Sequence, residues 1–303
     1  MHNKVISVSG GGKDGTLVMW EPGKILLSDL STVCSVAGVP GMCPKAPSKR
    51  DVFRKVFGSV VSKVLKRMPK GKRLRIVPLH PSVIGFEAKL MEPGLNSTEF
   101  EHYLSAQLDF YDRPVIVDAA NSHPTIHQHK LPALEQVLGV AYDDLMRYLP
   151  ATRLSDIIAG HLTSLRAVPL KTGGGAYFLP ENSAVAFAQF ADGINVLNGK
   201  CKILTFRFEL LPTDESYEAV FTSVTDLAKR RLAEVEEGLQ SSALAGQKIT
   251  AKGSKSRLAV VTEVKAFLAE YEKILGVTLQ DIREAALHVE DAVNAQAALA
   301  CSI

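Results

Sequence analysis

The densest group of potential metal ligands in the sequence lies directly after a short apolar run. Its members are one carboxylate and three imidazoles, which together suit zinc, iron or manganese: Asp118, His123, His127 and His129. A His-x-x-x-His spacing brings two rings to one side of a helix, but Pro124 and the polar composition of the segment indicate a loop. We therefore expect no bound metal and no cofactor. A metal-dependent hydrolase or nuclease that uses these four residues is the alternative.

A second group of residues has the chemistry to bind an anion. Eleven Lys and Arg residues and one acid, Asp51, lie between Lys49 and Arg75, so this segment carries a charge of +10. Because the whole chain has 35 Lys and Arg and 32 Asp and Glu, the remainder has 24 against 31, a charge of −7. Such a segment attracts phosphates, with a merely solvated basic surface as the alternative. The residues expected to contact nucleic acid or another polyanion are Arg50, Arg54, Lys55, Lys63, Lys66, Arg67, Lys70, Lys72 and Arg73.

A glycine-rich segment, Ser9–Thr16, resembles phosphate-binding loops only in part. It lacks the Gly-x-x-x-x-Gly-Lys-Ser/Thr spacing, and Leu17–Trp20 after it is typical of a strand. It also resembles the Ser-Gly-Gly-x-Asp-Ser loop of ATP pyrophosphatases, with one extra glycine and with Gly15 at the hydroxyl position. We interpret Asp14-Gly15 as the turn of a hairpin. The sequence has no Gly-x-Ser-x-Gly elbow and no Cys-x-x-Cys pair, so reduced thiols are expected and an enzyme is the less favoured reading.

The basic segment contains the clearest helix in the sequence. Apolar residues recur at three- and four-residue spacing from Val52 to Met68, and Ser48 with Asp51 forms a capping pair before them. Phe53 and Phe57 fall on the apolar face of this helix, so readout of base sequence is not expected.

Shorter elements flank this helix. Six segments have the composition of strands, namely residues 24–27, 74–76, 83–90, 114–118, 177–179 and 204–210. We interpret residues 34–47 as a loop. Thr98 and Glu101 form a capping box that predicts a helix through Leu108. Further helices are expected at residues 134–145 and 157–165.

The last part of the chain is predicted to be helical. One helix covers residues 214–238, a polar stretch typical of a linker covers residues 240–255, and an Ala-rich helix ends near Ala300. Between the linker and that last helix runs an apolar stripe formed by Leu258, Val261, Val264, Phe267, Leu268 and Tyr271. The stripe must be buried, either on the 214–238 helix or against a second copy. We favour a homo-oligomer.

These elements predict an α+β fold, with a mixed sheet-and-helix body and a helical C-terminal element. Three domains are expected: an N-terminal α+β domain at residues 1–150, a second α+β domain at residues 151–239, and the linker with the C-terminal helices at residues 240–303. The chain has no basic leader and no run of eighteen apolar residues, which favours a cytoplasmic protein without a membrane partner.

The most distinctive local string is Arg166–Pro180, in which an arginine precedes Gly-Gly-x-Tyr-Phe-x-Pro. With the strand and long helices that follow, it resembles an uncharacterised, often phage-encoded protein family over about residues 150–300. The resemblance implies no known activity. The favoured function is therefore a non-enzymatic binding or assembly protein that associates with itself and contacts a polyanion; the sequence identifies no other protein partner.

Overall fold

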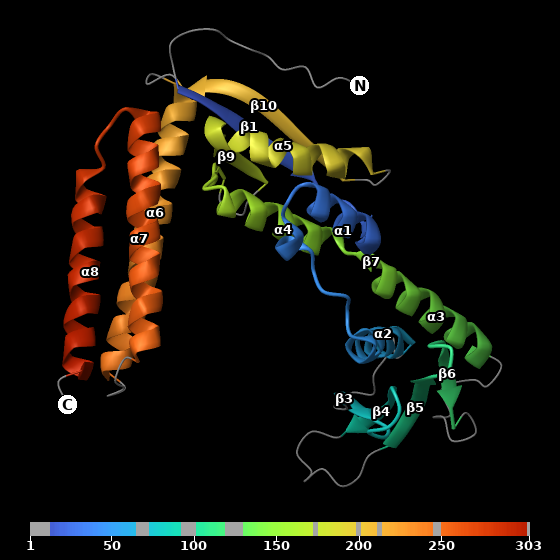
Figure 1. Ribbon diagram of the computed structural model, residues 1–303. Coiled ribbons are helices and arrows are strands. Elements are labelled where there is room, and N and C mark those ends of the chain that lie inside the picture. Colours follow the sequence, from blue (N-terminus) through green and yellow to red (C-terminus); the bar gives the residue numbers. More distant parts are fainter. Residues whose placement is uncertain are drawn as a thin grey trace. The chain divides into compact units, whose positions relative to one another are not determined.

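Figure 1 shows a computed structural model of the chain, which describes residues 13–64, 73–91, 101–118, 130–171, 175–197, 201–210, 214–244 and 250–301. Contacts divide the chain into two compact units. Unit 1 comprises residues 1–23, 33–42 and 151–303, and unit 2 comprises residues 24–32 and 43–150. Helices and antiparallel sheets make up both, so the predicted α+β class is confirmed. The division into three domains stays a prediction.

Unit 2 is built around a four-stranded antiparallel meander. The strands β3 (Arg73–Pro78), β4 (Gly85–Met91), β5 (Glu101–Leu108) and β6 (Pro114–Val117) lie in that order. The helices α2 (Lys49–Val64) and α3 (Leu131–Arg147) pack against each other and share one core with the sheet. A two-residue strand β2 (Ile25–Leu26) pairs with β7 (Tyr148–Leu149).

Helix α2 confirms the clearest prediction from the sequence. Its buried residues follow the expected spacing, and they are Val52, Phe53, Val56, Phe57, Val60 and Val61. The Ser48 carbonyl accepts from the Val52 N–H at 2.9 Å, and the Ser48 hydroxyl accepts from the Asp51 N–H at 3.4 Å. The amphipathic pattern and the cap together begin the helix where the sequence predicted. The expected continuation to Met68 lies outside the described residues.

The helix expected up to Leu108 is wrong, because residues 101–108 form the strand β5. This strand is central: Ala106 pairs with Phe86 on one side and with Ile116 on the other. The register shifts beside Ala88, so that Ala88 pairs with Leu104 and Lys89 with His102. Bonding to two neighbouring strands satisfies the backbone without a helix, which overrides the local capping pattern.

Unit 1 contains a second antiparallel sheet, ordered β10-β1-β9-β8. These strands are β1 (Lys13–Glu21), β8 (Val168–Pro169), β9 (Ala176–Pro180) and β10 (Lys202–Leu210). The helices α4 (Ala151–Ser164) and α5 (Glu181–Val196) belong to the same unit, and α1 (Leu27–Val36) runs into it from unit 2. The short segment Pro40–Met42 is a 3-10 helix. The expected strand at 24–27 is therefore shorter, and part of the expected loop at 34–47 is helical.

The predicted hairpin turn at Asp14-Gly15 is also wrong. Both residues lie inside β1, where they pair with Glu209 and Phe208 of β10. A Cβ on Gly15 would lie 2.0 Å from Cε2 of Phe178, so the glycine leaves room for a ring of β9 that is fully buried. The glycine serves close packing in a strand interior and does not make a turn.

Three long helices follow one another and form a bundle (Figure 1): α6 (Glu215–Leu244), α7 (Ala251–Leu275) and α8 (Gln280–Cys301). The stripe from Val261 to Tyr271 is buried in one core with α6 and α8. The stripe is thus buried by other helices of the same chain, which was the alternative to burial against a second copy. The homo-oligomer stays a prediction that this stripe no longer supports.

The expected linker at residues 240–255 is mostly helix. Helix α6 continues to Leu244, and α7 begins after Thr250, whose hydroxyl accepts from the Gly253 N–H at 3.1 Å. The Arg257 guanidinium donates to the Gly238 carbonyl at 3.0 Å and to the Ser242 hydroxyl at 3.1 Å, which joins the two helices there. These tertiary contacts stabilise helix in a stretch with the composition of a linker. None of the described helices is both long and apolar enough to span a membrane.

Candidate functional site

A groove in unit 2 lies between helix α2 and the edge strand β3. It has a volume of about 680 Å³. Helix α2 contributes Asp51, Arg54, Lys55, Gly58 and Ser59 to its lining. Strand β3 contributes Leu74, Arg75, Ile76, Val77 and Pro78. Three cations therefore face one carboxylate in this groove.

The local structure determines which side chains reach solvent beside the groove. Helix α2 buries its apolar face, so Arg54 and Lys55 are exposed on the other side. Along β3 the burial alternates: Arg73 and Arg75 are exposed, while Leu74 and Ile76 between and after them pack against the core. The period of a helix and the period of a strand thus bring cations from two elements to one surface.

These cations differ from their neighbours in having no partner in the part of the chain that the structure describes. Lys49 is paired with Asp112 at 2.6 Å, and the Arg50 guanidinium donates to the Pro81 and Val83 carbonyls at 3.1 and 3.4 Å. Among the described residues, by contrast, no ion pair or hydrogen bond engages the side chains of five exposed cations, which are Arg54, Lys55, Lys63, Arg73 and Arg75. Lys66, Arg67, Lys70 and Lys72 lie outside the described residues.

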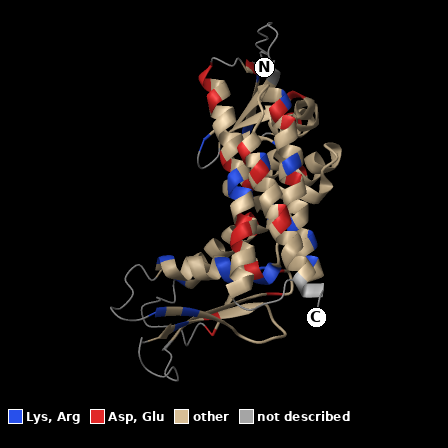
Figure 2. Cartoon of the chain, turned by 90° about the vertical axis from the view of Figure 1, so that its left-hand side faces the viewer, with Lys and Arg blue, Asp and Glu red and all other residues tan. Residues whose placement is uncertain are grey.

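The strand next to β3 adds a small charged cluster. Lys89 of β4 is directly opposite Arg75 in the register. Glu87 contacts Lys89 at 3.0 Å and Nδ1 of His102 at 2.7 Å. Burial works to raise the pKa of Glu87, but the hydrogen bonds from His102 and Lys89 outweigh it and the pKa is lowered. Figure 2 shows Lys and Arg along the strands of this sheet. Because Glu87 already pairs with Lys89, Arg75 is the member of this opposed pair that has no partner among the described residues.

Comparison with known proteins places the chain in a family. A family model described as a family of unknown function (DUF6744) matches residues 15–300. The chain belongs to this family. No curated protein and no solved structure matches it. The resemblance to an uncharacterised family is thereby confirmed in its coarser form.

The histidine segment contributes nothing to this groove in the part of the chain that the structure describes. Asp118 follows β6, is exposed, and has a positive φ of 53°. His123, His127 and His129 lie outside the described residues. Within the described ranges, no three His, Cys, Asp or Glu side chains are grouped so that they could hold a metal ion. The absence of a metal at this segment stays a prediction.

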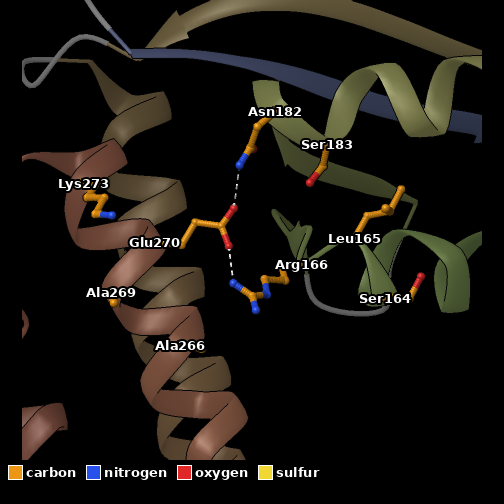
Figure 3. Close-up of a pocket in the computed structure, with 9 residues that line it drawn as sticks. All are labelled: Ser164, Leu165, Arg166, Asn182, Ser183, Ala266, Ala269, Glu270 and Lys273. Carbon is orange, nitrogen blue, oxygen red and sulfur yellow. Dashed lines mark hydrogen bonds and ion pairs between the residues drawn. The ribbon is translucent and has the colours of Figure 1, made fainter.

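A second hollow, of about 660 Å³, lies in unit 1 and is shown in Figure 3. Arg166 and Asn182 converge on Glu270 of α7, with contacts of 2.7 and 3.2 Å to its two carboxylate oxygens. Lys273 also lines the hollow. Because the guanidinium and the carboxylate neutralise each other, this hollow attracts an anion less strongly than the groove in unit 2 does.

Arg166, the first residue of the distinctive motif, lies at the C-terminal end of helix α4. Arg166 has a φ of 60° and ends α4: its N–H bonds the Thr163 carbonyl at 3.0 Å, and the Ala167 N–H bonds the Leu162 carbonyl at 2.9 Å. This is the pattern of a Schellman motif, in which glycine is usual at this position. The hydroxyl of Tyr271 donates to the Arg166 carbonyl at 2.8 Å, so the turn is tied to α7.

The aromatic half of the motif also packs inside unit 1. The Phe178 ring lies 6.2 Å from the Tyr271 ring, and Tyr177 lies 5.5 Å from Trp20. Pro180 pairs with Gly15 in the sheet. The motif therefore joins the sheet to the helices, and its residues build the fold of this unit.

Arg75 belongs to the groove but was absent from the residues that the sequence singled out for anion binding. It lay within the basic segment, and its alternation with Leu74 and Ile76 was the available signal. That alternation predicts an exposed cation on a strand, but only the pairing of β3 at the sheet edge places it beside α2.

Proposed function

We propose that this protein is a non-enzymatic binding protein that holds nucleic acid, or another polyanion, on the basic surface of α2 and β3. The observation that carries the proposal is the set of five exposed cations that have no partner among the described residues. Clustered cations repel one another, and a polyanion relieves that repulsion while it releases counterions. The same surface offers the groove as a track for a phosphate backbone.

The chemistry of the groove supports binding without a preference for base sequence. Its charged groups are three cations, which suit phosphate oxygens, and one carboxylate: Arg54, Lys55, Arg75 and Asp51. Its remaining lining is small or aliphatic, with Gly58, Ser59 and residues 76–78. Contacts to phosphates position a nucleic acid but do not read its bases. The affinity should therefore depend strongly on salt and weakly on sequence.

Charge reversal in the full chain tests the proposal. The triple variant Arg54→Glu, Lys55→Glu, Arg75→Glu should lose at least about tenfold in affinity for a labelled oligonucleotide at low salt. The slope of log affinity against log salt should also fall by about two to three, because each phosphate contact contributes roughly 0.7 to 0.9. Fluorescence anisotropy across a salt series measures both quantities.

A control variant with the same change of charge separates local binding from net charge. Lys229, Lys252 and Lys255 are exposed residues of unit 1, and replacing all three by Glu changes the net charge equally. This control should retain most of the affinity. Equal losses in both variants, or unchanged binding in the groove variant, would refute the groove as the site.

A phage origin and self-association are further parts of the proposal. Light scattering of the intact chain measures self-association.

A further inference from the structure

We propose that the turn between β5 and β6 is a stacking platform for unpaired bases, so that the nucleic acid bound by this protein is single-stranded. This inference rests on the function proposed above. The turn carries two adjacent aromatic residues, Phe110 and Tyr111, whose exposed fractions are 94% and 72%. An exposed aromatic ring forgoes the stabilisation that burial would supply, so folding does not account for the pair.

The turn holds both rings in a defined place. One carboxylate oxygen of Asp109 accepts from the backbone N–H groups of Tyr111 and Arg113, each at 2.8 Å. The other accepts from Nε of Arg113 at 3.0 Å, and Asp112 takes a positive φ of 60°. The hydrogen bond from the Arg113 backbone is the main cause that lowers the pKa of Asp109. Since the turn is ordered before any ligand arrives, binding costs it little conformational entropy.

The arrangement of the side chains is that of an aromatic and cationic tip. The Phe110 and Tyr111 rings are 5.4 Å apart and nearly perpendicular, with an angle of 88°. The guanidinium of Arg113 lies 5.0 Å from the centre of the Tyr111 ring. Arg113 is also paired with Asp109 at 2.9 Å, so the rings supply the stacking surface and the cations of the groove supply the contacts to phosphates.

The turn lies at the same end of unit 2 as the start of the groove. Lys49, the first residue of α2, pairs with Asp112 in the turn at 2.6 Å. Its neighbour Arg50 bonds the carbonyls of Pro81 and Val83 in the connection from β3 to β4. The groove includes Asp51 and Pro78, which adjoin these contacts in the chain. A nucleic-acid strand that binds along the cations of the groove therefore reaches the rings of Phe110 and Tyr111.

Stacking discriminates between single and double strands. In a duplex the faces of the bases are covered by their neighbours, whereas an unpaired base can lie on an aromatic ring. Proteins that bind single strands without sequence preference combine a basic groove with aromatic stacking residues. The groove and the turn supply one part each, which favours a single-stranded ligand over a duplex.

The experiment uses the full chain and three labelled ligands of equal length: a single-stranded oligonucleotide, its duplex, and inorganic polyphosphate. The variant Phe110→Ala, Tyr111→Ala should lose about tenfold in affinity for the single strand for each ring removed, and nothing for polyphosphate. Replacing both residues by Trp should retain the affinity. Val185→Ala, which changes another strongly exposed apolar residue, 81% exposed, should have no effect.

The outcomes separate this inference from the proposed function. If the groove variant loses all three ligands while the turn variant binds the single strand as wild type does, the groove stands and the platform is wrong. If wild type binds none of the ligands, both proposals are wrong. Loss of binding to phosphatidylglycerol vesicles in the turn variant, with unchanged binding to the single strand, would assign the rings to a membrane and overturn the inference.

Discussion

The two units use charge and aromatic residues differently. In unit 1, cations pair with acids across elements, as in Arg166 with Glu270 at 2.7 Å and Arg231 with Glu263 at 3.2 Å. In unit 2, the cations of the groove have no partner among the described residues. Unit 2 buries Phe53 and Phe57 as unit 1 buries Tyr271, but only in unit 2 do two adjacent aromatic residues among those described, Phe110 and Tyr111, stand more than 70% exposed. Side chains that pair with or pack against one another stabilise the fold, whereas side chains that are exposed and unpaired are available to a ligand.

The largest expected difference in stability between the two units comes from removing one aromatic ring from each. Phe178→Ala deletes a fully buried ring of unit 1 and should lower the free energy of unfolding by about 3–5 kcal/mol. Phe110→Ala deletes an exposed ring of unit 2 and should change it by less than about 0.5 kcal/mol. Urea denaturation followed by circular dichroism measures both. Similar losses in the two variants would contradict the contrast between scaffold and binding surface.

Replacing one glycine by alanine in each unit should change the free energy of unfolding in opposite directions. Gly15→Ala in β1 places a Cβ 2.0 Å from the Phe178 ring, so the core must shift, and a loss of about 1–3 kcal/mol is expected. Gly58→Ala in α2 places a Cβ at 3.6 Å from Ile76, an ordinary contact, and should gain up to about 1 kcal/mol from helix propensity. Thermal unfolding of the two variants gives the signs. A stabilised Gly15→Ala would show that β1 does not need close packing there.

The smallest effect concerns the end of α4 in unit 1. Arg166→Ala loses the partly exposed ion pair with Glu270 and leaves the positive φ of 60° as it is in the wild type, so a loss of up to about 1 kcal/mol is expected. Arg166→Gly loses the same ion pair but relieves the backbone, and its stability should be closer to wild type. The glycine variant should therefore unfold at higher urea than the alanine variant. The reverse order would mean that the positive φ costs less than the backbone freedom that glycine adds to the unfolded chain.

The success of the sequence-based predictions followed the strength of local patterns. Helix α2 was predicted correctly because six buried residues recur at helical spacing behind a capping serine. Residues 101–108 were predicted wrongly because Tyr103, Leu104 and Leu108 fit either period, and pairing with β4 and β6 decides between them. The basic segment was visible as composition, but its groove needed Arg75 on the neighbouring strand.

The sequence by itself determined the α+β class, the amphipathic helices and the concentration of positive charge, since each depends on residues close together in the chain. Only the tertiary structure decided that the stripe of α7 is buried against α6 and α8, that Gly15 lies under Phe178, and that Phe110 and Tyr111 are exposed on an ordered turn. The first two depend on contacts between segments far apart in sequence, whereas the turn is held by hydrogen bonds within residues 109–113 and its exposure is a property of the folded unit. Local spacing shows which side chains share a face, but it does not show what that face meets.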